Sequence, residues 1–295
     1  MPETHLPLAV ALDGAGWHPA AWRDPSADPK GLFTAGHWAA LVTEAERGLL
    51  DFVTFEDSFG LQSTRHDAPD DRTDQVRGRF DAALLAARLA PLTSRIGLVP
   101  TATTTHTEPF HVAIGIASLD HVSAGRAGWR VQVSARPFEA AHFGRREFPR
   151  QAGPPDRWAG FLADLLAEAA DAVEVAHRLW DSWEDDAEIR DVATGRFIDR
   201  DRLHHIDFAG RFFRVKGPSI TPRPPQGRPP VTALARTREG YEFAARCADL
   251  VYVTPHDADQ ARFIVAEVRE LPRTGGPLRI WADLTVFLDA APGRA

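Results

Sequence analysis

Short apolar runs of strand length alternate with longer amphipathic segments along most of the chain. Runs of about four to eight apolar residues have the length of buried strands, and the segments between them repeat apolar positions at helical spacing. In chain order, the predicted strand and helix pairs are 6–12 and 36–47, 52–55 and 79–89, 96–99 and 110–119, 128–133 and 158–183, 231–235 and 240–247, and 250–253 and 258–271, with a last strand at 280–288. Repeated units of this kind predict an α/β fold with a parallel sheet covered by helices. The pattern alone favours a closed barrel only modestly over an open sheet.

The run from Leu179 to Val231 breaks this alternation. It combines an acidic, Trp-containing helix end with a polar turn at Thr194–Gly195, short strands around Phe208 and at Phe212–Val215, and a proline-rich connector. These features predict an excursion from the sheet near 184–228 and indicate no particular chemistry.

Composition limits the classes of partner. The chain of 295 residues is 44% hydrophobic and 25% charged, which is enough to bury the core of one large domain over 1–295. Lys and Arg number 34 against 41 Asp and Glu, and the net charge of -7 gives no reason to expect nucleic acid or another polyanion as a partner.

The cysteine content and the absence of long apolar stretches predict a soluble, cytoplasmic protein. Cys247 is the single cysteine, so no intrachain disulfide forms, and it is expected to be a small buried side chain on a helix. No apolar stretch approaches about eighteen residues, and the N-terminus lacks a basic start followed by a long apolar region. Neither a membrane span nor a signal peptide is expected.

Several segments carry a family resemblance by their order and spacing. They are GWHPAAWR at 16–23, AERGLLDFVTFEDSF at 45–59, IGLVPTATTTHTEPFHVA at 96–113, LDHVSAGRAGWRVQVS at 119–134, and the run 179–231. Together they resemble the nitrilotriacetate and dibenzothiophene-sulfone monooxygenase branch of the bacterial luciferase-like flavin-dependent superfamily. The resemblance implies a TIM (β/α)8-type barrel with the insertion near 184–228.

The resemblance also implies an activity. Such proteins are two-component monooxygenases, which take reduced FMN from a separate flavin reductase and use O2 to oxygenate a small organic substrate. A homo-oligomer is expected. No Gly-x-Gly-x-x-Gly follows a strand, which agrees with the absence of a nicotinamide-binding domain.

Flavin contacts are expected where strands end, because sites in such barrels lie at the carboxyl ends of the strands. Asp57 follows the strand 52–55 and matches an acidic residue that the family places beside the flavin ring. Without the resemblance, Asp57 reads as a cap of the following loop or helix. In the threonine cluster at 101–105, Thr103 best matches a flavin-contacting Ser or Thr, whereas β-propensity and capping explain at least two of the others.

Two histidines are the candidate catalytic residues on the substrate side. His18 follows the first strand beside Trp17, and the two side chains are expected to line the substrate cavity. His106 stands where relatives often have Tyr, which makes it a substrate-side or proton-handling group, or simply a hydrogen-bonded loop residue. No spacing of His, Cys or acidic residues indicates a metal site.

Three departures from the family pattern affect the cofactor site. Arg130 stands where relatives commonly have Asn, and Arg157–Trp158 replaces an Arg-Tyr pair, so that Trp158 offers only an indole N–H. At the phosphate end, Thr237 matches a phosphate-binding Ser, with Arg236 beside it in place of a Gly-containing turn. Three alternatives follow: altered FMN binding, a deazaflavin cofactor, or a non-catalytic homologue that acts as an interaction subunit.

The C-terminal end of the sequence does not establish whether the barrel closes. Only DAAPGRA follows Leu288, whereas relatives continue through an eighth strand and further helices. Either the barrel is incomplete and a partner covers its open edge, or the chain is truncated.

Overall fold

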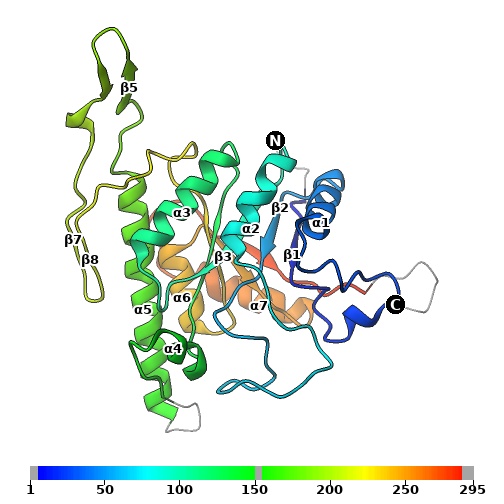
Figure 1. Ribbon diagram of the computed structural model, residues 1–295. Coiled ribbons are helices and arrows are strands. Elements are labelled where there is room, and N and C mark those ends of the chain that lie inside the picture. The colour runs from blue at the N-terminus through cyan, green and yellow to red at the C-terminus, as the bar shows by residue number, and fades with distance from the viewer. Residues whose placement is uncertain (1–5, 150–154, 288–295) are drawn as a thin grey trace. The chain divides into compact units, whose positions relative to one another are not determined.

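Every strand that was predicted before residue 134 forms in the computed structural model, which describes residues 6–149 and 155–287 (Figure 1). The chain divides into two compact units, residues 1–231 and 232–295. A single domain over 1–295 stays a prediction.

The first unit is built on four parallel strands with helices between them. The strands pair in the order β1 (Ala9–Leu12), β2 (Phe52–Phe55), β3 (Gly97–Thr103) and β4 (Trp129–Gln132). The helices that connect them are α1 (Ala35–Arg47), α2 (Ala82–Leu89) and α3 (Pro109–Val122). The helix predicted from residue 79 begins later, because Asp81 is its N-cap and accepts from the Leu84 amide at 2.8 Å.

One face of these strands forms the core against α1 and α2. Val53, Phe55 and Leu98 pack with Val42 of α1 and Leu89 of α2, and each of these side chains is at most 1% exposed. Burying a side chain of this size contributes about 1.5–3 kcal/mol. The strands are therefore held from the helix side, and their positions are set by apolar packing.

The opposite face of the same strands carries several polar side chains. Because side chains alternate along a strand and paired residues share a face, Thr54, Thr101 and Thr103 lie on the face away from the α1–α2 core. The register pairs Thr101 with Arg130 and Thr103 with Gln132, which extends the polar face across β4. Polar side chains are thus concentrated toward the carboxyl ends of β2, β3 and β4.

The long helix α5 (Pro155–Trp180) leads from this region to the insertion. Trp180 is 1% exposed, and its indole N–H donates to the Ala113 carbonyl of α3 at 2.9 Å. A short helix that the sequence pattern did not predict, α4 (Pro137–Phe143), precedes α5.

The insertion consists of two antiparallel hairpins. β5 (Glu188–Asp191) pairs with β6 (Arg196–Ile198), and β7 (Phe208–Ala209) pairs with β8 (Arg214–Val215) (Figure 1). The predicted turn at 194–195 lies between β5 and β6, and the predicted short strands near 208 and 212–215 correspond to β7 and β8. The predicted insertion near 184–228 is confirmed as an excursion from the parallel strands.

The second unit contains a further parallel arrangement. β9 (Val231–Leu234) pairs with β10 (Leu250–Val253), which pairs with β11 (Arg279–Ala282), and α6 (Arg238–Cys247) and α7 (Ala258–Arg269) connect them. The last strand is shorter than the predicted 280–288, since Asp283 to Phe287 have no regular structure and Leu288 lies outside the described residues. Cys247 is half-buried rather than fully buried. No helix in the described residues has the length and apolarity needed to cross a membrane.

Candidate functional site at the carboxyl ends of the first strands

Groups from three neighbouring strand ends meet at Gln132, two from side chains and one from the backbone of Asp57. Its side-chain amide donates to the backbone oxygen of Asp57 at 2.9 Å and to Thr103 Oγ1 at 3.3 Å. The Thr104 hydroxyl donates to the backbone oxygen of Gln132 at 3.2 Å. Two of the predicted flavin contacts, Asp57 and Thr103, are therefore brought together by a glutamine that was not among the predicted site residues.

The Asp57 carboxylate lies at the beginning of α2. Its Oδ2 accepts from the Ala82 amide at 3.0 Å, and its Oδ1 accepts from the Ser58 amide at 2.7 Å. Burial raises the pKa of the Asp57 carboxyl above its usual value, while the two amide hydrogen bonds act in the opposite direction. The structure therefore supports the capping interpretation of Asp57, and each carboxylate oxygen still has a lone pair for another donor.

Arg130 forms a buried ion pair with Glu56. The two side chains are 9% and 11% exposed, and the guanidinium contacts the Glu56 carboxylate directly. Glu56 directly precedes Asp57 and was not among the predicted site residues. The Glu56 carboxylate neutralises the charge of Arg130 on this face. The arginine that stands where relatives commonly have Asn therefore has its own counter-ion.

Two buried hydroxyls on this face have no hydrogen-bond partner among the described residues. Thr54 Oγ1 and Thr101 Oγ1 lie in residues that are 4% and 1% exposed. Buried polar atoms are normally hydrogen-bonded, so a bound molecule or water is expected to complete these two. Thr105, in contrast, is used structurally, because its hydroxyl oxygen accepts from the Ser134 amide at 3.0 Å.

His106 is buried in an aromatic stack just beyond β3. Its ring lies 4.8 Å from Phe143 and 5.0 Å from Phe148, with interplanar angles of 13° and 28°. Its backbone has a φ of 72°, a left-handed conformation that is unusual for a residue with a side chain. The Nε2 atom is buried and has no hydrogen-bond partner in the part of the chain that the structure describes. Strain and an unpaired buried ring atom together are typical of a functional position.

The same stack continues to Trp158 on α5. Phe148 contacts Phe161 at 4.8 Å, and Phe161 contacts Trp158 at 5.5 Å. Trp158 also contacts His66 at 5.5 Å. The predicted cofactor residue Trp158 is therefore joined to His106 by aromatic packing, and no described contact joins it to Asp57 or Thr103.

His106 is expected to make folding sensitive to acid. Burial, with smaller contributions from the charges of Arg146 and Arg145, lowers the pKa of His106 from 6.5 to about 4. Below pH 6.5 the unfolded chain binds a proton that the folded chain excludes, so stability falls as the pH decreases from 6.5 toward 4. The loss has an upper limit of about 3 kcal/mol.

This expectation is checked by urea unfolding at several pH values. In the variant His106→Tyr, which keeps an aromatic ring, the difference in unfolding free energy from wild type should change between pH 6.5 and 4 and be constant above pH 7. Parallel curves for the two proteins over the whole range would show that His106 titrates normally.

His18 and Trp17 lie on the loop that follows β1, and both are exposed. His18 Nδ1 accepts from the Ala20 amide at 3.1 Å, and the Trp17 indole donates to the Ala11 carbonyl at 3.2 Å. No described contact brings His18 to His106. A role for either histidine on the substrate side therefore stays a prediction.

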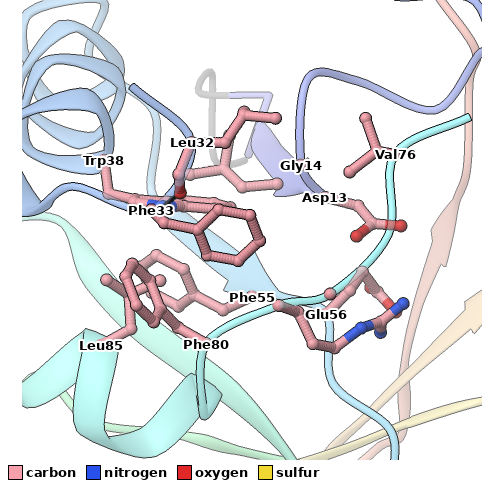
Figure 2. Close-up of a pocket in the computed structure, with 13 residues that line it drawn as sticks. Asp13, Gly14, Leu32, Phe33, Trp38, Phe55, Glu56, Val76, Phe80 and Leu85 are labelled. Carbon is pink, nitrogen blue, oxygen red and sulfur yellow. Dashed lines mark hydrogen bonds between the residues drawn. The ribbon is translucent and has the colours of Figure 1, made fainter. Parts of the chain in front are cut away.

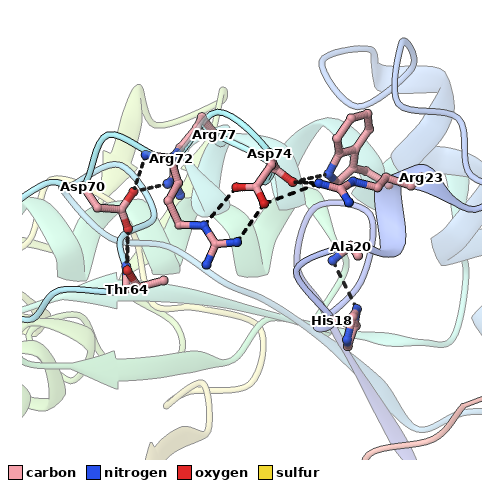
Figure 3. A network of polar contacts seen from close by, with 9 residues as sticks. His18, Ala20, Arg23, Thr64, Asp70, Arg72, Asp74 and Arg77 are labelled. Carbon is pink, nitrogen blue, oxygen red and sulfur yellow. Dashed lines mark hydrogen bonds and ion pairs between the residues drawn. The ribbon is translucent and has the colours of Figure 1, made fainter.

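The His18 loop is fixed to the long connection between β2 and α2 by a charged network. Asp74 pairs with Arg72 at 2.7 Å and with Arg23 at 3.4 Å, and Asp70 pairs with Arg77 (Figure 3). The Arg72 guanidinium holds the pKa of Asp74 at about 2, so this carboxyl remains charged at neutral pH.

A small pocket with room for about one water molecule lies at the carboxyl ends of β1 and β2 (Figure 2). Apolar side chains, Phe33 and Phe80 among them, lie on one side, and Asp13 and Glu56 lie on the other. Arg79 also lines it. Glu56 therefore belongs both to this pocket and to the buried pair with Arg130.

The predicted phosphate contacts lie in the second unit. Thr237 is the N-cap of α6 and accepts from the Gly240 amide at 3.4 Å, while Arg236 is exposed. Arg238 pairs with Glu242 and Glu267. Within residues 6–149 and 155–287, no group of three or more His, Cys, Asp or Glu side chains has the arrangement of a metal site.

Comparisons with known proteins agree with the resemblance seen in the sequence. The family model for luciferase-like monooxygenases matches residues 15–295. The nitrilotriacetate monooxygenase component A of Aminobacter aminovorans is 36% identical over 267 residues, which are 89% of this chain and 56% of that protein. Dibenzothiophene-sulfone monooxygenases are also among the relatives, which confirms the predicted branch.

Solved structures show the same fold. A long-chain alkane monooxygenase is similar with a TM-score of 0.81 and 25% identity, covering 92% of this chain and 61% of that one. A riboflavin lyase with modified FMN and riboflavin has a TM-score of 0.72 and 30% identity, covering 89% and 58%. The predicted α/β fold of luciferase-like barrel proteins is confirmed. The chain spans little more than half the length of the relatives it matches.

Proposed function

Because the chain belongs to the luciferase-like monooxygenase family, we propose that the protein is an FMN-dependent monooxygenase of the two-component type. The observation that carries the proposal is the polar face of β2, β3 and β4, where the buried hydroxyls of Thr54 and Thr101 have no partner within residues 6–149 and 155–287. The ring edge of a flavin offers nitrogen and oxygen atoms that complete such groups. These residues therefore fit the cofactor that the family uses.

In this proposal, Asp57 and Thr103 hold the ring from two strand ends, and Gln132 fixes them relative to each other. A phosphate-binding role for Thr237 and Arg236, at the beginning of α6, stays a prediction from the family resemblance. When bound, reduced FMN supplies the electrons and the atom at which oxygen reacts. The chain orients the ring and keeps water away from it.

Arg130 and Trp158 receive more limited roles. The pairing of Arg130 with Glu56 supports a positioning role, in which the cation holds a carboxylate of the pocket wall. Trp158 supports the aromatic stack around His106. His106 is proposed as a neutral hydrogen-bonding group on the substrate side, because its lowered pKa removes the protonated form at neutral pH.

The partners proposed are a separate flavin reductase, O2, a small organic substrate and a second copy of the chain in a homo-oligomer. A cytoplasmic location is proposed with them. Neither the deazaflavin cofactor nor a non-catalytic role is favoured, since the relatives at 30% identity or more include named monooxygenases. The counter-ion of Arg130 also removes one reason for expecting a lost flavin site.

The test is the release of hydrogen peroxide from reduced FMN. Anaerobic reduced FMN is mixed with oxygen, with and without an excess of the protein. The proposal expects bound FMN to release peroxide at least about tenfold more slowly than free FMN, which corresponds to about 1.4 kcal/mol in the barrier. Release at the rate of free FMN would contradict the proposal.

A further inference from the structure

The short helix α4 packs against loops that follow three neighbouring strands. After β2, the ring of Phe59 lies 4.8 Å from that of Phe143 and meets it edge to face. After β3, the ring of His106 stacks on Phe143 at 4.8 Å. After β4, the Ser134 hydroxyl donates to Glu139 Oε2 at 2.7 Å. Phe143 and Glu139 both belong to α4, so this helix joins the three loops.

The joined loops continue from the residues of the candidate flavin site. Their contacts with α4 come two or three residues after Asp57, Thr103 and Gln132. Because so few residues separate these contacts from the site, α4 limits how far the ends of β2, β3 and β4 can move. The position of α4 therefore affects the geometry of the site.

Glu139 is a buried charge on α4. The residue is 1% exposed, and the Ser134 hydroxyl gives one of its carboxylate oxygens a hydrogen bond. The other oxygen lies 3.6 Å from the Arg136 guanidinium, which is too far for a hydrogen bond. A buried carboxylate is costly unless it is hydrogen-bonded, so the contact with Ser134 helps to keep Glu139 out of water. Ser134 is itself fixed, since its amide donates to Thr105 Oγ1 at 3.0 Å.

Glu139 and Phe143 lie four residues apart and therefore share one face of α4. The loop after β2 approaches Glu139 closely, because a Cβ on Gly60 would lie 3.1 Å from Glu139 Cγ and would overlap the Phe138 ring. In such close packing the carboxylate has little room to change its conformation while the helix stays in place. Movement of Glu139 toward water would therefore carry Phe143 away from His106.

We propose that Glu139 is a positioning residue, which fixes α4 through Ser134 and thereby keeps His106 enclosed by Phe143 and Phe148. That the enclosed ring lies on the substrate side of an oxygenase rests on the proposed function, whereas the positioning itself does not. The role includes no covalent step.

The experiment measures how fast diethyl pyrocarbonate modifies His106 in the full chain at pH 7. Mass spectrometry of proteolytic peptides gives the rate relative to that of the exposed His18. Glu139→Ala should accelerate modification of His106 relative to His18 by at least about tenfold, because local opening at α4 exposes the ring. Glu139→Gln should keep wild-type protection, because its amide oxygen still accepts from Ser134.

Glu46→Ala is the matched control for a general loss of stability. The Glu46 carboxylate on α1 accepts from three backbone amides before β3, so this variant weakens the fold without removing a contact of α4. Its relative rate of His106 modification should equal that of wild type. Ser134→Ala removes the same hydrogen bond by a smaller change and should also accelerate modification, which keeps the test decisive if Glu139→Ala fails to fold. Wild-type protection in either alanine variant of the pair, loss of protection in Glu139→Gln, or equal acceleration in Glu46→Ala overturns the proposal.

The modification is measured without flavin, so the two proposals fail independently. If reduced FMN releases peroxide at its free rate in the presence of wild type while the variants behave as expected, the oxygenase proposal fails and the positioning role stands. If peroxide release is slowed and Glu139→Ala keeps wild-type protection of His106, the positioning role fails alone.

Discussion

Replacing Arg130 by alanine is expected to lower the free energy of unfolding by about 3–5 kcal/mol, because it leaves the Glu56 carboxylate buried and unpaired. The cost arises from the desolvated charge that remains, rather than from the lost attraction alone. Urea unfolding at pH 7 measures it. Exposed Arg88→Ala is the matched control, and its effect should stay within about 0.5 kcal/mol.

A double variant separates pairing from packing. Glu56→Gln combined with Arg130→Met removes both charges, and it should recover most of the stability that either single change loses. If the double variant is as unstable as the sum of the single variants, the two side chains do not interact, and the assignment of Arg130 to this ion pair is wrong.

Asp57→Ala is expected to weaken binding of reduced FMN by at least about tenfold, equivalent to about 1.4 kcal/mol. Because Asp57 also accepts from the first amide of α2, the same change should lower the unfolding free energy by about 1 kcal/mol. Anaerobic fluorescence titration and urea unfolding of the same preparation measure the two effects.

Asp57→Asn is the control that distinguishes these roles. Its amide oxygen preserves one backbone hydrogen bond, so stability should approach the wild-type value, whereas affinity for reduced FMN should remain lowered because the charge is gone. Wild-type affinity in Asp57→Ala, together with the expected loss of stability, would restrict Asp57 to capping α2.

The order of strands and helices could be predicted from the sequence because apolar spacing reports burial directly. Val53 and Phe55 alternate along β2, and together with Leu98 of β3 they form part of the core face. The helix α4 escaped prediction because its seven residues are too few to establish a helical period. The last strand was predicted too long because apolar residues continue beyond Ala282 without strand pairing.

The candidate site was only partly predictable, since it depends on which strands are neighbours. Asp57 and Thr103 were expected at strand ends, and Gln132 joins them. In the sequence, only the alternation of polar residues in β4 pointed to Gln132. That alternation identifies a site residue only when the pairing of β4 with β3 is known. Similarly, the partner of Arg130 lies far away in the sequence at Glu56.

The different environments of the two candidate histidines could not be predicted from the sequence. His18 and His106 both follow strands, yet one is exposed and the other is enclosed by Phe143 and Phe148. Phe143 belongs to α4, and Phe148 lies in the loop that follows it. Burial of His106 therefore depended on segments whose packing no local pattern reveals, and so did the direction of its pKa shift.

The central claim is that the polar face at the ends of β2, β3 and β4 belongs to a site for reduced FMN. Anaerobic equilibrium titration of the purified chain with reduced FMN tests it most directly, with oxidised FMN as the comparison. We expect saturable binding of reduced FMN with a Kd of about 1 μM or lower, near -8 kcal/mol, and weaker binding of oxidised FMN. Absence of saturable binding of reduced FMN at concentrations up to about 1 mM would contradict it.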